Sequence, residues 1–154
     1  MQLTQAQVDE YNERGFLLLP DLFAAEEIAL MRAERDRIAS IETDHAVRFA
    51  KIRTIYRIHE LDGPTASPLY HTLGRTPRLL QPAMQLLNDE ELYIFNSRLY
   101  SKDAFVGTSM LWHQDYGYWK LDRVPTPSLV QCMIMLTDVD VLDGSLVLIP
   151  GSHR

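Results

Sequence analysis

The chain has 154 residues, 46% of them hydrophobic and 23% charged, which is typical of a globular domain and unlike a disordered or fibrous protein. Its 21 acidic and 15 basic residues give a formal charge of −6 without a basic block, so nucleic acid and membrane surfaces are not expected partners. Residues 1–13 are polar, and no apolar run is long enough to span a membrane. The single cysteine, Cys132, excludes an intrachain disulfide and lies in an apolar run that predicts a buried strand thiol. These features predict one cytoplasmic domain over residues 1–154.

The first predicted element is a short amphipathic helix over residues 4–14. Thr4 and Gln7 have the spacing of a capping box, in which each side chain accepts a hydrogen bond from the other residue's backbone N–H. Gly15 follows the helix and can adopt the left-handed conformation that ends one.

The rest of the first 90 residues predicts a mixed, mainly helical region. Residues 16–19 form a compact apolar run stopped by Pro20, which predicts a short strand. Residues 24–38 carry apolar residues at helical spacing among many charges, and residues 76–87 open with Thr-Pro, a common helix start. Residues 51–58 are rich in β-formers and predict a strand between these two helices.

The pattern changes beyond residue 90. Four runs rich in β-branched, aromatic and apolar residues are separated by Gly, Pro and Asp, as is typical of strands joined by turns. The predicted strands cover residues 92–100, 110–115, 130–137 and 145–149.

Two candidate metal ligands, His113 and Asp115, lie two residues apart in the second of these runs. In a strand, side chains at i and i+2 leave the same face, so both could bind one ion. Two histidines and one carboxylate on a single face are the ligands of many iron(II) oxygenases, which leave the opposite face open. The triplet alone favours a surface histidine hydrogen-bonded to a nearby aspartate, since His and Asp are common polar neighbours.

The wider context of the triplet carries a family resemblance. A Trp-His-x-Asp run begins at Trp112, Trp119 follows the histidine by six residues, and a Gly-Ser-Leu-x-x-Ile-Pro-Gly-Ser-His run ends at His153. A Tyr-x-x-x-Gly-Phe-x-x-x-Pro segment occupies residues 11–20. Together these motifs resemble the phytanoyl-CoA dioxygenase family of Fe(II)/2-oxoglutarate-dependent oxygenases, most strongly over residues 92–154.

The resemblance implies a fold and an activity. The family's fold is a double-stranded β-helix, or jelly roll, which is mainly β with helices at the N-terminus. Its members use Fe(II), with 2-oxoglutarate as co-substrate, to hydroxylate a small-molecule substrate with O₂, and they release succinate. Family halogenases have a small residue where the carboxylate ligand stands, so Asp115 implies hydroxylation or another two-electron oxidation.

The resemblance also implies roles for five residues. His113 and Asp115 are the expected metal-binding and catalytic residues. Asn96 stands where a hydroxylase of the family has a glutamine near 2-oxoglutarate, and Arg98 and Trp119 match positions that line the co-substrate and substrate cavity. A guanidinium group suits a carboxylate, so Arg98 is expected to bind the co-substrate. An ordinary ion pair for Arg98 and core packing for Trp119 stay open as alternatives.

The sequence departs from the family after the Pro-Gly-Ser-His run. The four predicted strands are half of the number that a jelly roll needs, about eight. In the family, the third iron ligand and the basic residue that binds 2-oxoglutarate lie further downstream. The favoured interpretation is therefore an incomplete domain, with residues 91–154 as the first half of the β-helix and the C-terminal remainder of the same domain as partner. The alternative makes His153 the third ligand and Arg154 the carboxylate partner. His45, His59 and His71 are expected to be surface or hydrogen-bonded histidines.

Two competing functions remain open at the level of sequence. The first is a non-catalytic jelly-roll binding module, which requires the His-Asp pair to be incidental. The second is a folded but inactive fragment of the dioxygenase.

Overall fold

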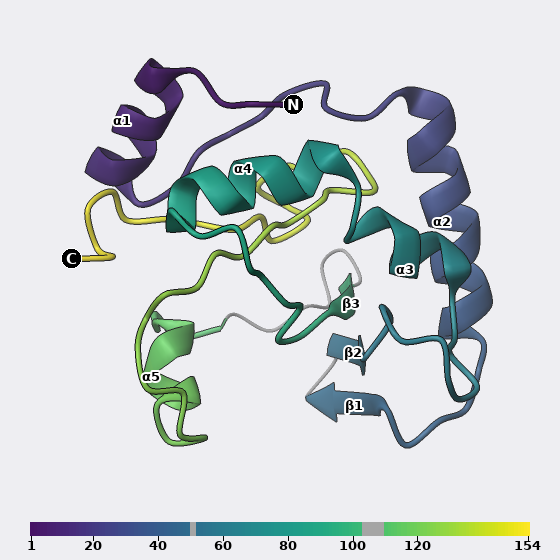
Figure 1. Ribbon diagram of the computed structural model, residues 1–154. Helices are drawn as coiled ribbons and strands as arrows, with labels where there is room; N and C mark the ends of the chain where they lie inside the picture. The colour runs from purple at the N-terminus through teal and green to yellow at the C-terminus, as the bar shows by residue number, and fades with distance from the viewer. Residues whose placement is uncertain (50–51, 103–109) are drawn as a thin grey trace.

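The computed structural model describes residues 1–49, 52–102 and 110–154 (Figure 1). Helices α1, α4, α3 and α2 arch over a small sheet, and the segment that carries α5 extends away below α4 (Figure 1). The helices in the described ranges are α1 (Gln5–Arg14), α2 (Ala25–Ala39), α3 (Pro68–Leu73), α4 (Pro77–Leu87) and α5 (Asp115–Trp119). The strands are β1 (Ala46–Phe49), β2 (Ile52–Tyr56) and β3 (Arg98–Lys102).

Helix α1 has the capping groups that the sequence predicts. The Gln7 backbone N–H donates to Thr4 Oγ1 at 3.3 Å, and the Thr4 backbone N–H donates to Gln7 Oε1 at 2.9 Å. Gly15 ends the helix at a φ of +83°, and its N–H donates to the Tyr11 carbonyl. The predicted helices over residues 24–38 and 76–87 are likewise confirmed as α2 and α4.

The sheet is antiparallel, in the order β1-β2-β3. Its central strand confirms the strand predicted over residues 51–58, and its register places Thr54 opposite both Val47 and Tyr100. The strand predicted over residues 16–19 is wrong, since this run is irregular. An apolar run of four residues becomes a strand only where another strand accepts and donates its hydrogen bonds, and no strand of the described chain does so here.

A compact apolar core lies between α2, α3 and the sheet. Ile38 is fully buried, and Ile55 and Tyr70 are 3% and 6% exposed. The buried members of this core are Met31, Ile38, Ile55, Ile58, Tyr70 and Leu99. All of them come from the first two thirds of the chain, so the helices and the sheet share one core.

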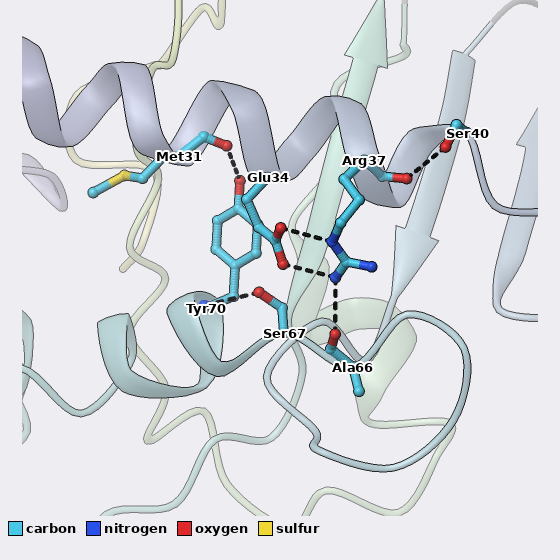
Figure 2. Close-up of polar contacts among 7 residues, drawn as sticks. All are labelled: Met31, Glu34, Arg37, Ser40, Ala66, Ser67 and Tyr70. Carbon is cyan, nitrogen blue, oxygen red and sulfur yellow. Dashed lines mark hydrogen bonds and ion pairs between the residues drawn. The ribbon is translucent and has the colours of Figure 1, made fainter.

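Polar contacts join α2 to α3 at the edge of this core (Figure 2). The Tyr70 hydroxyl donates to the Met31 carbonyl at 2.7 Å, and burial raises the pKa of Tyr70 to about 12. Arg37 donates to Glu34 and to the Ala66 carbonyl before α3, so the pKa of Glu34 is lowered (Figure 2). The Met31 carbonyl satisfies the Tyr70 hydroxyl, a polar group that burial would otherwise penalise.

Three of the four strands predicted beyond residue 90 are corrected by the structure. Only the run over residues 92–100 overlaps a strand, β3, whereas residues 110–115, 130–137 and 145–149 join no strand ladder among the described residues. A strand requires a partner for its backbone N–H and C=O groups, and sequence composition does not supply that partner. The predicted N-terminal helices and antiparallel pairing are present, while the jelly roll is not seen in the part that the structure describes.

The segment over residues 130–137 nevertheless keeps a strand-like alternation. Ile134 and Leu136 pack against the core, whereas Met133 and Met135 are 47% and 48% exposed. Alternation with a period of two is the pattern of an extended chain with one covered face. Its opposite apolar face is open.

Cys132 corrects a further prediction, because it is exposed and lies outside any strand. Enough protein surrounds the sulfur that desolvation raises the pKa of the thiol. Among the described helices, none is both long enough and apolar enough to cross a membrane. The cytoplasmic location stays a prediction.

Candidate metal site

His113 and Asp115 are brought together at the start of α5. Asp115 is the first residue of this helix, and Gln114 before it is extended, with φ −114° and ψ 125°. The chain thus turns from an extended segment into a helix between the two side chains. His113 Nε2 and Asp115 Oδ1 lie 3.3 Å apart, with the two side chains 32% and 25% exposed. The predicted proximity is present, although a turn into a helix creates it and not a strand.

A backbone contact fixes how the His113 ring is protonated. Nδ1 lies 2.7 Å from the Leu111 carbonyl oxygen, which can only accept, so Nδ1 carries a proton and donates it. In a neutral ring the lone pair is then on Nε2, the nitrogen that faces Asp115. Two acceptors at 3.3 Å repel unless a second proton or a cation lies between them. This is the arrangement of a metal-binding histidine whose other nitrogen is held by a carbonyl.

Arg98 binds the other oxygen of the same carboxylate. Its Nη2 donates to Asp115 Oδ2 at 3.2 Å, and its guanidinium lies over the Tyr100 ring at 5.1 Å. Asp115 therefore has one oxygen toward a cation and the other toward His113. The ion pair that the sequence left open as an alternative for Arg98 is present, and its partner is the candidate ligand itself.

The donor set is compatible with an iron(II) ion. Two ligand atoms in neighbouring coordination positions, each about 2 Å from an ion, lie about 3 Å apart, which is close to the observed separation. Imidazole nitrogen and carboxylate oxygen are two of the three ligand types in the facial triad. Among the described residues, no third His, Cys, Asp or Glu joins them to complete a metal-binding cluster. The pair provides part of a site.

Aromatic side chains flank the pair. The Tyr118 ring meets the His113 ring edge-on, with centroids 5.9 Å apart. Trp119 packs edge-on against Phe95, with centroids 5.5 Å apart. Asn96 is exposed, and no hydrogen bond among the described residues connects it to His113 or Asp115. Of the three predicted co-substrate residues, Arg98 is the one whose side chain is hydrogen-bonded to the pair.

A shallow cavity of about 300 Å³ opens beside His113. Apolar side chains from the 145–149 run form one side of it, and the residues around His113 form the other. Its lining residues are Trp112, His113, Gln114, Val147, Leu148, Ile149 and Ser152. The cavity places the motif around the triplet beside the later Gly-Ser-Leu run, which sequence spacing alone did not predict.

His153 and Arg154, the alternative third ligand and carboxylate partner, lie at the end of α1 in this structure. His153 Nε2 lies 3.2 Å from the Asn12 carbonyl, at the end of α1, and Arg154 Nη2 donates to the same carbonyl at 2.7 Å. Neither side chain reaches the His113–Asp115 pair. The other histidines are hydrogen-bonded near the sheet: His59 Nδ1 contacts Ser97 Oγ, and burial lowers the pKa of His59.

Comparison with known proteins defines the class of protein to which this arrangement belongs. The family model described as phytanoyl-CoA dioxygenase (PhyH) matches residues 11–154, so the match includes the triplet, the aromatic cluster and the Pro-Gly-Ser-His loop. The chain belongs to the phytanoyl-CoA dioxygenase family, and the resemblance drawn from its motifs is confirmed.

Particular relatives are similar over nearly the whole chain. An ectoine dioxygenase from Bordetella bronchiseptica is 36% identical over 160 residues, covering 99% of this chain and 50% of the relative. One from Halomonas elongata is 32% identical, covering 99% of this chain and 46% of the relative. The crystal structure of EctD from S. alaskensis with 2-oxoglutarate and 5-hydroxyectoine is similar with a TM-score of 0.66 at 31% identity, over 76% of this chain and 42% of that one. The chain spans about half the length of these relatives.

Proposed function

We propose that the chain is part of a non-haem Fe(II)/2-oxoglutarate-dependent dioxygenase that hydroxylates a small molecule. The observation that carries the proposal is the geometry of the His113 ring: Nδ1 lies 2.7 Å from the Leu111 carbonyl oxygen, and Nε2 lies 3.3 Å from an oxygen of Asp115. Since the carbonyl can only accept, a neutral ring directs the Nε2 lone pair at Asp115. Membership of the dioxygenase family adds the expected metal. When bound, Fe(II) supplies the oxidation of a C–H bond by O₂, coupled to decarboxylation of 2-oxoglutarate to succinate.

The chain's own residues would have separate roles in this reaction. His113 and Asp115 bind the metal. The Arg98 guanidinium holds Asp115 Oδ2, and in the same position its positive charge attracts the carboxylate of 2-oxoglutarate. Asn96 and Trp119 are proposed as further contacts of the co-substrate and substrate. Asp115 fills a coordination position that a family halogenase leaves for a halide, which favours hydroxylation.

The substrate proposed for testing is ectoine. The relatives at 30–36% identity carry the name ectoine dioxygenase, and their similarity extends over the residues around the candidate site. A small carboxylate-bearing molecule also suits a site that has an arginine beside aromatic rings. The exposed Tyr118 ring against His113 is the proposed wall of the substrate cavity.

The proposed partner of the described residues is the C-terminal remainder of the same domain, which would complete a jelly roll. Two observations support this. The chain spans about half of its relatives, and the apolar side chains of Met133, Met135, Leu146 and Leu148 are 43–55% exposed. An opposing sheet would cover them and pair the open backbone groups. That remainder is also where the family places its third ligand.

Iron- and 2-oxoglutarate-dependent succinate release tests the proposal. The full-length protein encoded by the gene is incubated with Fe(II), ascorbate, O₂ and 2-oxoglutarate, with and without ectoine, and succinate and hydroxylated product are quantified. Succinate formation that requires iron and the intact His113–Asp115 pair supports the dioxygenase. A protein that binds ectoine without consuming 2-oxoglutarate would favour the binding module. Succinate release without hydroxyectoine would reject ectoine as the substrate and leave the dioxygenase proposal standing.

A further inference from the structure

The loop over residues 150–154 lies against the end of α1, far away in sequence (Figure 1). Gly151 N–H donates to the Arg14 carbonyl at 2.8 Å. His153 Nε2 and Arg154 Nη2 both reach the Asn12 carbonyl, at 3.2 and 2.7 Å. The last carbonyls of a helix have no partner within the helix and carry partial negative charge, so N–H donors and cations stabilise them. The loop therefore completes the C-terminal cap of α1.

The fit of this loop depends on a glycine. Gly15 has a φ of +83°, and a Cβ added there would lie 2.3 Å from Nδ1 of His153. The ring thus packs directly on the Gly15 backbone, with Nδ1 against the glycine and Nε2 donating to Asn12. Neither ring nitrogen is directed at the His113–Asp115 pair. The histidine of the Pro-Gly-Ser-His run, His153, thus holds the loop against the end of α1.

Gln114 connects the docked loop to the candidate ligands. Its side-chain amide donates to the Ser152 carbonyl, one residue before His153. Its neighbours in sequence on either side are His113 and Asp115, and His113 and Ser152 line the same cavity. The contacts form a continuous path from α1 through the loop to the short segment that holds both ligands.

We infer that Gln114 and His153 are positioning residues for the metal-binding pair, with α1 as their support. This inference rests on the proposed metal site. The described contacts of the 111–115 segment are few, and α5 has only five residues. A ligand pair at the turn between an extended segment and a one-turn helix requires an external anchor to keep its geometry, and outer contacts of this kind alter metal affinity.

Mn(II) affinity of the full-length protein, measured by water-proton relaxation with Mn(II) alone as the probe, tests the inference. Gly15→Ala pushes the His153 ring away without touching the metal pair, and Gln114→Met removes the amide donor at similar length. We expect each to raise the Mn(II) dissociation constant about tenfold, the lower end of the effect of losing an outer contact. Because both substitutions act through one path, the variant that carries both should bind Mn(II) no more weakly than either single variant.

Gly63→Ala is the matched control. Gly63 has nearly the same φ, +81°, but the nearest atom to an added Cβ, in His45, is 3.8 Å away. The backbone strain is equal and the loop is untouched, so Mn(II) affinity should stay at the wild-type value. His153→Ala should weaken Mn(II) binding as Gly15→Ala does, and His153→Gln should restore most of it, because the amide can still donate to Asn12.

The outcomes separate the inference from the proposed function. If Asp115→Asn binds Mn(II) as well as the wild type, the metal site is elsewhere and both fail. If Asp115→Asn loses binding while Gln114→Met and Gly15→Ala keep it, the metal site stands and the positioning role is overturned. If His153→Gln is as weak as Asp115→Asn, His153 is a ligand and the inference is likewise overturned. Should Gly15→Ala not fold, Gln114→Met and the His153 pair of variants decide the question.

Discussion

Residues 1–102 bury a shared apolar core, whereas residues 110–154 carry the candidate ligands and leave most of their large apolar side chains exposed. Every buried hydrophobic residue in the described chain lies in the first region. In the second, Leu111 is 89% and Val147 63% exposed. The buried core of the first region is built from its own residues, and Ile134, Leu136 and the 150–154 loop add contacts from the second region. The second holds the candidate site, which contacts Arg98 through Asp115 and Ser152 through Gln114.

The difference between the two regions explains how one chain can contain both a well-packed scaffold and an open site. Helices satisfy their own backbone groups, so the first region needs only caps and one apolar face per helix. Segments with strand-like composition need partners, and residues 130–137 and 145–149 find none among the described residues. The proposed remainder of the domain would supply both those partners and the third ligand.

The largest expected effect is the loss of 2-oxoglutarate turnover when a histidine of the candidate site, and not one of the first region, is replaced. His113→Ala removes one of the two proposed ligands and should lower 2-oxoglutarate turnover by at least about 10³-fold, because positioning and metal chemistry are lost together. His45→Ala changes a histidine in the first region, away from the candidate ligands. It should leave turnover within about twofold, as expected for a substitution outside the site. Succinate release at limiting iron measures both. Equal losses in the two variants would contradict the division between scaffold and site.

The second prediction compares burial in the two regions. Ile38 is fully buried, so Ile38→Ala in the 154-residue chain should cost about 3 kcal/mol of unfolding free energy through the lost transfer energy and the cavity. Leu146 is 55% exposed, so Leu146→Ala should change it by no more than about 0.5 kcal/mol. Urea denaturation measures both values. In a longer form containing the rest of the domain, the cost of Leu146→Ala should rise, and an unchanged cost would reject the proposed covering sheet.

Local signals predicted the first region well. The capping box at Thr4, Gly15 at a left-handed φ and Pro77 at the start of α4 act within a few residues, so α1 and α4 begin and end where the sequence indicates. Helix α3 and strand β1 were missed, because α3 is only six residues long and β1 is defined by pairing with β2. Pairing is not encoded in the composition of a single strand.

The candidate site was predicted only in part, because local spacing is visible in the sequence and contacts between distant residues are not. The spacing of His113 and Asp115 brings them together in either a strand or a turn into a helix, so their proximity did not depend on the element. The Arg98–Asp115 and Gln114–Ser152 contacts join residues 17 and 38 apart in the chain. No local pattern specifies such contacts. The nearest signal was the family motif, which placed these residues in related segments without showing that they touch.

The third prediction is a loss of stability at alkaline pH that originates in the scaffold. The folded protein holds the Tyr70 proton up to a pKa of about 12, above its ordinary value of 10. Below pH 10 Tyr70 is protonated in both the folded and the unfolded states, so this residue does not change stability there. Between pH 10 and 12 only the unfolded state loses the proton, and stability should fall by about 1.4 kcal/mol per pH unit.

Paired phenylalanine variants isolate this effect. Tyr70→Phe should remove the largest part of the alkaline loss, although it forfeits the hydrogen bond to the Met31 carbonyl; smaller parts remain because burial also raises the pKa values of Tyr11 and Cys132. Tyr93→Phe, at an 81% exposed position, should retain the full loss. Urea denaturation at pH 8, 10 and 11 gives the slope of the unfolding free energy against pH for each variant. An identical slope in both variants would show that Tyr70 is not the group responsible.

The smallest expected effect tests how locally α1 is stabilised, at the end opposite the 150–154 loop. Thr4→Ala removes the side-chain oxygen that accepts from the Gln7 N–H and should cost about 1 kcal/mol. The N-cap of α2 offers the reverse experiment, since Ala24 has no side-chain cap bond, and Ala24→Ser should stabilise the chain by about 0.5–1 kcal/mol. Both are measured by urea denaturation. Because Thr4 lies a full helix length from Gly15, Thr4→Ala should leave Mn(II) affinity unchanged while Gly15→Ala weakens it. A parallel loss of metal affinity in both would mean that the site responds to helix stability in general, and that the contact between the loop and the end of α1 has no special role.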